Sequence, residues 1–408
     1  MKGYSRLLEG NSIGKVPGKL RMKIAVTSTP SWPYIRRGNR CSYELAVYLA
    51  ERGHEVHYIT TKPGSVRREK SQGKVHVEYN PLSGHPVLSK CKIHFVETFT
   101  LPCLRSLLRN NYDIVQTTFP VDAFAASLNR SIRGTPFVHL LYDSYPLYQA
   151  TALSKLMFRN VVRSASRLIA ISNFVNMDLR KHFQVDGVVI PLPVDTSRFS
   201  PAGEGQINNA VILCTASLTV SRKRVNLLVK AFEHLIEKRP DAALVLSGHT
   251  DAATNTALLQ SVHAKARKAI SIIGVGQERS LPDLYRSAAL TVLPSVNEAF
   301  GLVVIESLAS GTPVVGTRSG GIPDILDDPG VGILFEPTDG PDELSEALLR
   351  GLNLSEDPRT RLRCRQHAER YSWNTLGPHY EMCFHEVLEK KGLHAGSMRL
   401  SERKRWFC

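Results

Sequence analysis

The chain has 408 residues, of which 42% are hydrophobic and 22% charged, a composition typical of a globular protein with room for two or three domains. Its seven cysteines are scattered and include no CxxC pair, which argues against a disulfide framework or a thiolate zinc site. No apolar run is long enough to cross a bilayer, and the first twenty residues lack the apolar core of a signal peptide. We therefore expect a cytoplasmic protein.

The net charge of +15 is unevenly distributed. Residues 1–193 contain 27 Lys or Arg and 12 Asp or Glu, whereas residues 194–408 contain 25 of each. A one-sided basic field attracts anionic partners such as phospholipid surfaces or phosphorylated ligands, although a solvated surface that serves solubility is an equal alternative. No RNA-binding or helix-turn-helix signature accompanies the charge, so we do not expect a nucleic-acid partner.

Strand and helix patterns alternate along the chain after an N-terminal extension, residues 1–20. A strand at 22–29, a helix at 42–53 and a strand at 54–61 begin the series, which continues with the strands 112–118, 135–142, 167–172 and 185–191. The Pro-, Gly- and Ser-containing segment 190–205 predicts a linker, and a second alternating series starts at residue 211. The last segments are a predicted helix and a basic tail.

This alternation predicts an α/β protein with two Rossmann-like, doubly wound parallel-sheet domains that face a cleft. The predicted boundaries are 21–193 for the first domain, 194–375 for the second domain, 376–393 for a C-terminal helix that packs back on the first domain, and 394–408 for the tail. Ligands of such sheets bind outside the carboxyl ends of the strands.

The segment 294–317, PSVNEAFGLVVIESLASGTPVVGT, carries the most specific pattern. It predicts a strand end, a loop and a helix that begins near Gly301, whose free N–H groups suit an anion such as phosphate. Glu298 lies before this helix and Glu306 lies eight positions later. Two carboxylates that flank a phosphate-binding helix suit a ligand with hydroxyl-rich sugars on both sides of a diphosphate, which describes a nucleotide sugar.

The run EAFGLVVIE resembles the E-x7-E motif of retaining glycosyltransferases of family 4, which have the two-domain GT-B fold, and the resemblance covers roughly residues 22–390. It implies transfer of a hexosyl unit from a nucleoside diphosphate sugar to an acceptor hydroxyl, with retention, in the synthesis of a glycolipid, polysaccharide or other glycoconjugate. It also implies that the domain 21–193 is the acceptor-side domain and that the domain 194–375 binds the nucleotide-sugar donor. Within the second domain it implies that Glu298 contacts the donor sugar, that the N–H groups at Phe300, Gly301 and Leu302 hold the diphosphate and sugar, and that Glu306 holds the ribose hydroxyls.

The stretch TASLTVSRKRV departs from the family pattern, in which an Arg precedes by six residues a Lys that grips the donor diphosphate. Lys223 takes the Lys position, but Ser217 stands where the Arg is expected. Arg222 or Arg224 is the candidate replacement, provided that its guanidinium reaches the same phosphate oxygens.

A second departure lies in GTPFVHLLYDS, where the family often has His-Asp and the His contacts the donor sugar near the reaction centre. Here the pair is Tyr142 and Asp143, our further catalytic candidates. A phenol donates a hydrogen bond but does not accept a proton near neutral pH as imidazole does. Strand alternation points His139 away from Tyr142, so we expect His139 to pack in the core.

Gly38 is the single glycine in the loop that corresponds to the family's glycine pair, and we expect its backbone near the donor. Arg36, Arg37 and Arg40 lie beside it, as ligand contacts or as surface charges. No Asp-x-Asp motif follows a strand and Asp327-Asp328 lies in a turn, so we expect neither a metal nor another cofactor, with phosphate charge met by Lys, Arg and helix N–H groups.

Two alternatives stay open, and one further surface is predicted. A catalytically weak sugar-nucleotide-binding protein would explain Tyr142 and Ser217, and an epimerase or phosphorylase could share the two-domain plan. In the segment 99–111 the residues that share one helical side are Leu101, Leu104, Leu107 and Leu108, with Arg105 and Arg109 on another side and Arg67, Arg68 and Lys70 on a preceding loop. This pattern predicts peripheral attachment to an anionic membrane, at the inner face of the cell membrane, and a lipid-linked or phosphorylated acceptor. The alternative is that the leucines pack on the sheet and the arginines face water.

Overall fold

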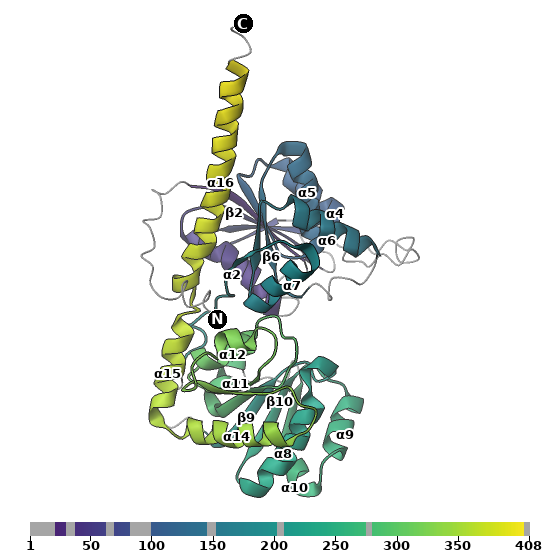
Figure 1. The fold of residues 1–408 in the computed structure, drawn as a ribbon, viewed down its shortest axis with the longest axis vertical. Coiled ribbons are helices and arrows are strands. Elements are labelled where there is room, and N and C mark those ends of the chain that lie inside the picture. Colours follow the sequence, from purple (N-terminus) through teal and green to yellow (C-terminus); the bar gives the residue numbers. More distant parts are fainter. Residues whose placement is uncertain are drawn as a thin grey trace. The chain divides into compact units, whose positions relative to one another are not determined.

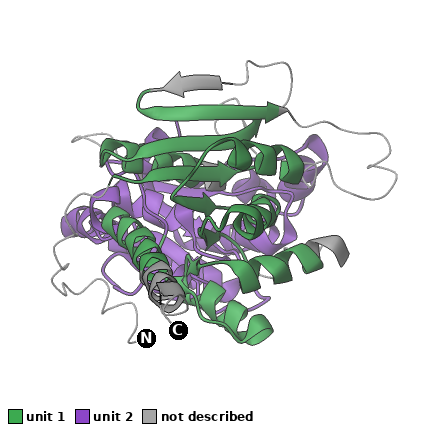
Figure 2. Ribbon diagram, turned by 90° about the horizontal axis from the view of Figure 1, so that it is seen from above, with its two compact units in different colours: residues 1–191, 377–408 green, residues 192–376 purple. Residues whose placement is uncertain are grey.

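The computed structural model describes residues 21–29, 37–62, 69–81, 99–144, 152–201, 208–274 and 280–403 (Figure 1). The chain forms two compact units, shown in two colours in Figure 2. Unit 1 comprises residues 1–191 and 377–408, and unit 2 comprises residues 192–376.

Unit 1 is built on an eight-stranded sheet with the order β3-β4-β2-β1-β5-β6-β7-β8. The strands are β1 (Lys23–Ser28), β2 (Glu55–Lys62), β3 (Glu69–Gln72), β4 (Val75–Pro81), β5 (Ile114–Thr117), β6 (Phe137–Leu141), β7 (Arg167–Ala170) and β8 (Val188–Val189). The helices are α2 (Arg37–Glu51), α4 (Thr100–Arg109), α5 (Pro120–Arg133), α6 (Ala152–Ser164) and α7 (Asn173–Phe183). All strand pairs are parallel except β3 with β4.

The central strands β1, β5 and β6 of unit 1 are buried on both faces, as helical crossovers require of a parallel sheet. All residues of β5 and β6 are buried, and α5 begins at Pro120 and ends at Gly134, whose φ of 70° is left-handed. The antiparallel edge formed by β3 was not predicted. The predicted helix 42–53 begins earlier, at Arg37, so it includes Gly38.

Unit 2 contains a six-stranded, wholly parallel sheet with the order β11-β10-β9-β12-β13-β14. Its strands are β9 (Asn208–Thr215), β10 (Ala243–Gly248), β11 (Ile270–Gly274), β12 (Ala288–Leu293), β13 (Val314–Thr317) and β14 (Gly332–Phe335). Its helices are the short 3₁₀ turn η3 (Ser221–Lys223), α8 (Val225–Lys238), α9 (Ala252–Gln260), α10 (Ala264–Lys268), α11 (Leu281–Ser287), α12 (Leu302–Ala309), α13 (Ile322–Ile325), α14 (Asp342–Ser355) and α15 (Pro358–Glu369). The predicted class, two doubly wound parallel-sheet domains, is confirmed.

The last helix, α16 (Trp373–Arg403), returns the chain to unit 1. Glu381 of this helix pairs with Arg52 and His54, each at 3.1 Å, and the Tyr380 hydroxyl donates to the Pro191 carbonyl at 2.9 Å. These contacts attach α16 to the turn between α2 and β2 and to the segment that follows β8. Within the described ranges, no helix combines the length and hydropathy needed to cross a membrane.

The predicted apolar side of α4 is only partly exposed. Leu107 is fully buried in the core of unit 1 and Leu104 packs against the same core, because α4 covers α5. Only Leu101 has most of its surface exposed, at 72%. Arg109 also forms an ion pair with Glu78 at 3.3 Å. Leu104 and Leu107 therefore follow the alternative in which the leucines of this helix pack on the core. Arg67 and Arg68, and the side chain of Lys70, lie outside the described part.

Candidate functional site

The amino end of α12 in unit 2 is the centre of the candidate site. β12 ends at Leu293 and a loop leads to Gly301, whose φ of 111° lies in the region that favours glycine. The helix that follows is buried from Val303 to Ala309, and Phe300 is buried as well. The first N–H groups of a helix have no partner within it, so those at Gly301 and Leu302 are available to an anion.

The loop before α12 is held by the segment that follows β13. Gly321 donates its N–H to the Glu298 carbonyl at 2.7 Å, and Asn297 donates its N–H to the Ser319 hydroxyl at 3.0 Å. Gly320 has a φ of 65°, and a Cβ there would lie 2.2 Å from the Glu298 carbonyl oxygen. The close approach of these two backbones fixes the position of Glu298.

Two cations converge on the Glu298 carboxylate. The Lys223 ammonium lies 2.6 Å from Oε2 of Glu298, and Nη1 of Arg222 lies 3.2 Å from the same oxygen. The Val296 N–H donates to the Arg222 carbonyl at 3.0 Å, which ties the 3₁₀ turn after β9 to the loop after β12. Residues predicted separately from two motifs thus form one ion-pair cluster.

Arg224 points elsewhere, although the sequence left it as an alternative to Arg222. Its backbone has a left-handed φ of 52° at the start of α8, and its side chain contacts the Thr338 carbonyl and Asp339. Ser217 pairs with the Thr219 hydroxyl at 3.3 Å. Of the two candidate replacements for the missing arginine, only Arg222 lies at Glu298.

Glu306 is held by a tyrosine that the sequence analysis missed. The Tyr285 hydroxyl donates to Oε2 of Glu306 at 2.9 Å and shares a second hydrogen bond with the Thr215 hydroxyl at 2.9 Å. Tyr285 is fully buried, and only 8% of Glu306 is exposed. The available signal was that Thr215 ends β9, at the carboxyl edge of the sheet where ligands bind.

In unit 1, Tyr142 follows β6 and its ring stacks beside Phe119, with centroids 6.5 Å apart. The Tyr142 hydroxyl is buried without a hydrogen-bond partner in the described part of the chain. Burial raises the pKa of Tyr142 well above its usual value, so the phenol stays protonated at neutral pH. Asp143 accepts a hydrogen bond from the Ser144 N–H at 3.1 Å.

His139 is fully buried in β6, as predicted for a core residue. Its Nδ1 lies 2.9 Å from the Thr117 hydroxyl. Burial lowers the pKa of His139 to about 3, so the ring is neutral near pH 7 and is no proton carrier there.

Gly38 lies in the first turn of α2 rather than in a loop. The predicted close approach of its backbone to a donor therefore involves a helix amino end, where the first N–H groups are unpaired within the helix. Arg40 pairs with Glu44, Arg36 lies outside the described residues, and the side chain of Arg37 is not described.

Asp122 is a buried carboxylate that the sequence analysis did not identify. It accepts hydrogen bonds from the Thr27 hydroxyl at 2.7 Å, the Thr118 N–H at 2.9 Å and the Phe119 N–H at 3.0 Å. These bonds join the carboxyl ends of β1 and β5 to the start of α5. Burial raises the pKa of Asp122 to about 7, against the opposing effect of its three donors.

Within the described ranges, no three His, Cys, Asp or Glu side chains are grouped so that they could hold a metal ion. Asp327 pairs with Arg370 at 3.0 Å and Asp328 with Arg363 at 2.6 Å. Both aspartates therefore form ion pairs with arginines of α15 and its carboxyl end.

Two family profiles match the chain, one for each unit. Residues 38–198 match the family described as Glycosyltransferase Family 4, and residues 209–353 match the one described as Glycosyl transferases group 1. The D-inositol 3-phosphate glycosyltransferase of Actinosynnema mirum is 29% identical over 380 residues, which cover 81% of this chain and 90% of that protein. That of Corynebacterium kroppenstedtii is 26% identical over 316 residues, covering 70% and 69%.

Solved structures share the fold at lower identity. Sucrose-phosphate synthase from Thermosynechococcus elongatus is similar with a TM-score of 0.77 and 19% identity, over 91% of this chain and all of that one. HepE from Anabaena, solved in complex with UDP-glucose, is similar with a TM-score of 0.68 and 17% identity, over 91% of this chain and 100% of that one. At this identity the likeness establishes a common fold.

Proposed function

Because this chain belongs to the family 4, group 1 glycosyltransferases and has their GT-B fold, we propose that it transfers a hexosyl unit from a nucleoside diphosphate sugar to an acceptor hydroxyl with retention. The observation that carries the proposal is the cluster of Lys223, Arg222 and Glu298 beside the amino end of α12. Two cations and free helix N–H groups match the charge of a diphosphate. The UDP-glucose bound to HepE supports the same donor class.

The donor contacts follow from this cluster. Lys223 and Arg222 hold the diphosphate together with the N–H groups of α12, and Glu298, once released from the cations, accepts hydrogen bonds from the sugar. Glu306, oriented by Tyr285, accepts hydrogen bonds from the ribose hydroxyls.

We propose a transfer without a metal ion. The bond between the anomeric carbon and the diphosphate oxygen breaks, the acceptor oxygen bonds to the same face of that carbon, and the departing phosphate takes the acceptor proton. Lys223, Arg222 and the helix N–H groups stabilise the charge that develops on the phosphate. Product NMR tests this step, because an inverted anomeric centre would refute it.

The acceptor that we propose is phosphorylated or lipid-linked and serves glycoconjugate synthesis. The A. mirum and C. kroppenstedtii relatives are named for D-inositol 3-phosphate, and the excess basic charge lies in residues 1–193. Mass spectrometry of products from panels of donors and acceptors would identify both substrates.

We further propose that unit 1 attaches to an anionic membrane, such as the inner face of the cell membrane, through α4 and α6. Both helices pack on α5 and lack acidic residues (Figure 1). Leu101 and Leu156 are 72% and 66% exposed, and Arg105 and Arg159 are exposed beside them. Exposed leucines among cations suit a peripheral contact, in which each cation contributes about 1 kcal/mol before salt screening.

Co-sedimentation with lipid vesicles tests this attachment. Binding should require anionic lipid, fall as salt rises, and weaken in an Arg105→Glu, Arg159→Glu double variant. Lys181→Glu, an exposed charge change on α7, is the matched control. Equal recovery with neutral and anionic vesicles would reject the attachment but leave the transferase proposal intact.

A catalytically weak sugar-nucleotide-binding protein is the second candidate, because Tyr142 stays protonated and Ser217 carries no charge. Donor-dependent transfer and donor hydrolysis separate the two functions. Tyr142→Phe should reduce turnover without loss of the fold if the hydroxyl contacts the sugar, whereas unchanged turnover would mean a structural role. Glu298→Ala should lower the rate and Glu306→Ala should chiefly weaken donor binding; full activity of both variants would exclude this site.

A further inference from the structure

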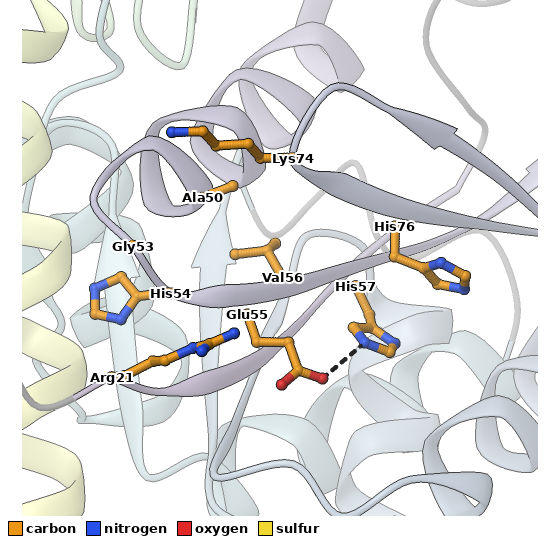
Figure 3. A pocket seen from close by; sticks show the side chains of 9 residues that line it. All are labelled: Arg21, Ala50, Gly53, His54, Glu55, Val56, His57, Lys74 and His76. Atoms are coloured by element: carbon orange, nitrogen blue, oxygen red, sulfur yellow. Dashed lines mark hydrogen bonds and ion pairs between the residues drawn. The ribbon is translucent and has the colours of Figure 1, made fainter.

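A pocket of about 390 Å³ lies in unit 1 at the amino ends of the strands (Figure 3). The charged and titratable side chains that line it are Arg21, His54, Glu55, His57, Lys74 and His76. They come from the segment before β1, from the start of β2 and from the start of β4. Tyr142 follows the carboxyl end of β6, so the pocket lies at the opposite edge of the sheet from the predicted sugar contact.

The pocket retains uncompensated positive charge. Glu55 is already paired with Lys23 at 2.8 Å, and this hydrogen bond is the main cause that lowers the pKa of Glu55. Arg21 and Lys74 have no ion-pair partner in the described part of the chain. Figure 3 shows the Arg21 side chain beside Glu55 and the Lys74 side chain over Ala50. Two cations therefore border a space that contains one carboxylate, which is neutralised.

The His57 ring lies beside the His76 ring and can gain a charge when an anion is present. The rings of His57 and His76 lie 4.8 Å apart, Nε2 of His57 lies 3.3 Å from Glu55, and the Tyr112 hydroxyl lies 3.1 Å from Nδ1 of His57. Burial lowers the pKa of His57, and the nearby His76 and Lys23 lower it further. An anion placed between these groups would offset that repulsion and favour the protonated ring.

His54 also lines the pocket, but its ring is bonded to other parts of unit 1. Its Nδ1 accepts the Met22 N–H at 3.2 Å, and its Nε2 lies 3.1 Å from Glu381 of α16. Both ring nitrogens are therefore occupied by the fold. Both ring nitrogens of His57 are likewise occupied, by Glu55 and Tyr112, so the groups left to meet a ligand directly are the cations Arg21 and Lys74.

We propose that this pocket binds a phosphate group, with Arg21 and Lys74 as its direct charge partners and the pair His57 and His76 beside it. Phosphate suits the site because a guanidinium donates two parallel hydrogen bonds to its oxygens while an ammonium acts as a point charge. The chemistry is shared by inorganic phosphate and by phosphate monoesters. None of the residues that line the pocket belongs to the donor cluster, so the inference does not rest on the proposed function.

The test is a titration of the full chain with inorganic phosphate, followed by calorimetry and by NMR of histidine-labelled protein, with chloride at equal ionic strength as reference. Saturable binding should shift the His57 and His76 signals and raise the pKa of His57. His57→Gln and His76→Gln assign the two signals. Unmoved signals at saturating phosphate would overturn the proposal.

Variants locate the bound phosphate. Arg21→Ala and Lys74→Ala should each weaken binding by about tenfold, the cost of one charge-assisted contact. Lys181→Ala, an exposed lysine on α7, is the matched control, and Lys223→Ala removes any phosphate bound in unit 2. An equal loss of phosphate binding in Lys181→Ala, or a loss in Lys223→Ala alone, would refute binding at this pocket.

A second titration separates the two sources of phosphate. Tighter binding of glycerol 3-phosphate than of inorganic phosphate would assign the site to a monoester, and equal or weaker binding would assign it to the free ion. Failure of both ligands would overturn the proposal, whatever the outcome of the transferase assays.

Discussion

Removal of the Tyr285 hydroxyl tests whether Glu306 needs to be held in place to bind a donor. Tyr285→Phe deletes one buried oxygen that lies 2.9 Å from Glu306 and 2.9 Å from Thr215. A hydrogen bond to a charged group is worth about 1.5 to 3 kcal/mol, and the carboxylate is too buried for water to replace the bond freely. If about half of this cost appears as misplacement of Glu306, donor affinity should fall by about four- to tenfold.

The assay is calorimetric titration of wild type and variant with a nucleoside diphosphate, together with kcat and KM for the sugar donor. A positioning role predicts a higher KM and Kd with a smaller change in kcat, because Tyr285 acts through Glu306 on binding. Tyr380→Phe is the matched control: its hydroxyl is equally buried and bonds to the Pro191 carbonyl in unit 1. Unchanged donor affinity in Tyr285→Phe, or an equal loss in Tyr380→Phe, would refute the reasoning.

Three further changes test other parts of the structure. Arg222→Ala should weaken donor binding by about tenfold in the same titration, whereas Arg224→Ala, which loses a side chain directed elsewhere, should leave it unchanged; the reverse order would exclude Arg222. Gly320→Ala should cost at least about 1 to 2 kcal/mol of stability, because alanine is strained in the left-handed conformation. It should also lower activity, because the added Cβ would collide with the Glu298 backbone. Denaturant unfolding at the wild-type midpoint would contradict this expectation. Because the pKa of His139 falls from about 6.5 unfolded to about 3 folded, its contribution to stability should decline by about 2 kcal/mol as pH falls from about 6.5 to about 5; His139→Gln should lack this decline.

The sheets could be predicted from the sequence, because buried parallel strands form continuous apolar runs between amphipathic helices. The antiparallel strand β3 could not, since its residues Glu69–Gln72 are polar and short. The apolar periodicity of α4 indicated one apolar side but not that Leu107 on this side enters the core.

The candidate site was predictable in part, since Lys223 and Glu298 both follow strands of one parallel sheet. The choice between Arg222 and Arg224 was not predictable, because it depends on a left-handed backbone angle at residue 224 that no local pattern indicates. The contact of Tyr285 with Glu306 joins two residues that are 21 positions apart and lie on different helices, a pairing that periodicity alone does not encode.

The ion pairs of Glu298 make this carboxylate a tethered counter-ion for Lys223 and Arg222. A donor that binds as proposed must exchange with it, so the cluster discriminates between ligands by their charge. A simple monoanion competes poorly with a carboxylate held 2.6 Å from the ammonium, whereas a diphosphate carries more charge to the same cations. The exchange would also release Glu298 at the moment when the diphosphate arrives, which couples the availability of the carboxylate for the sugar to occupancy of the phosphate site.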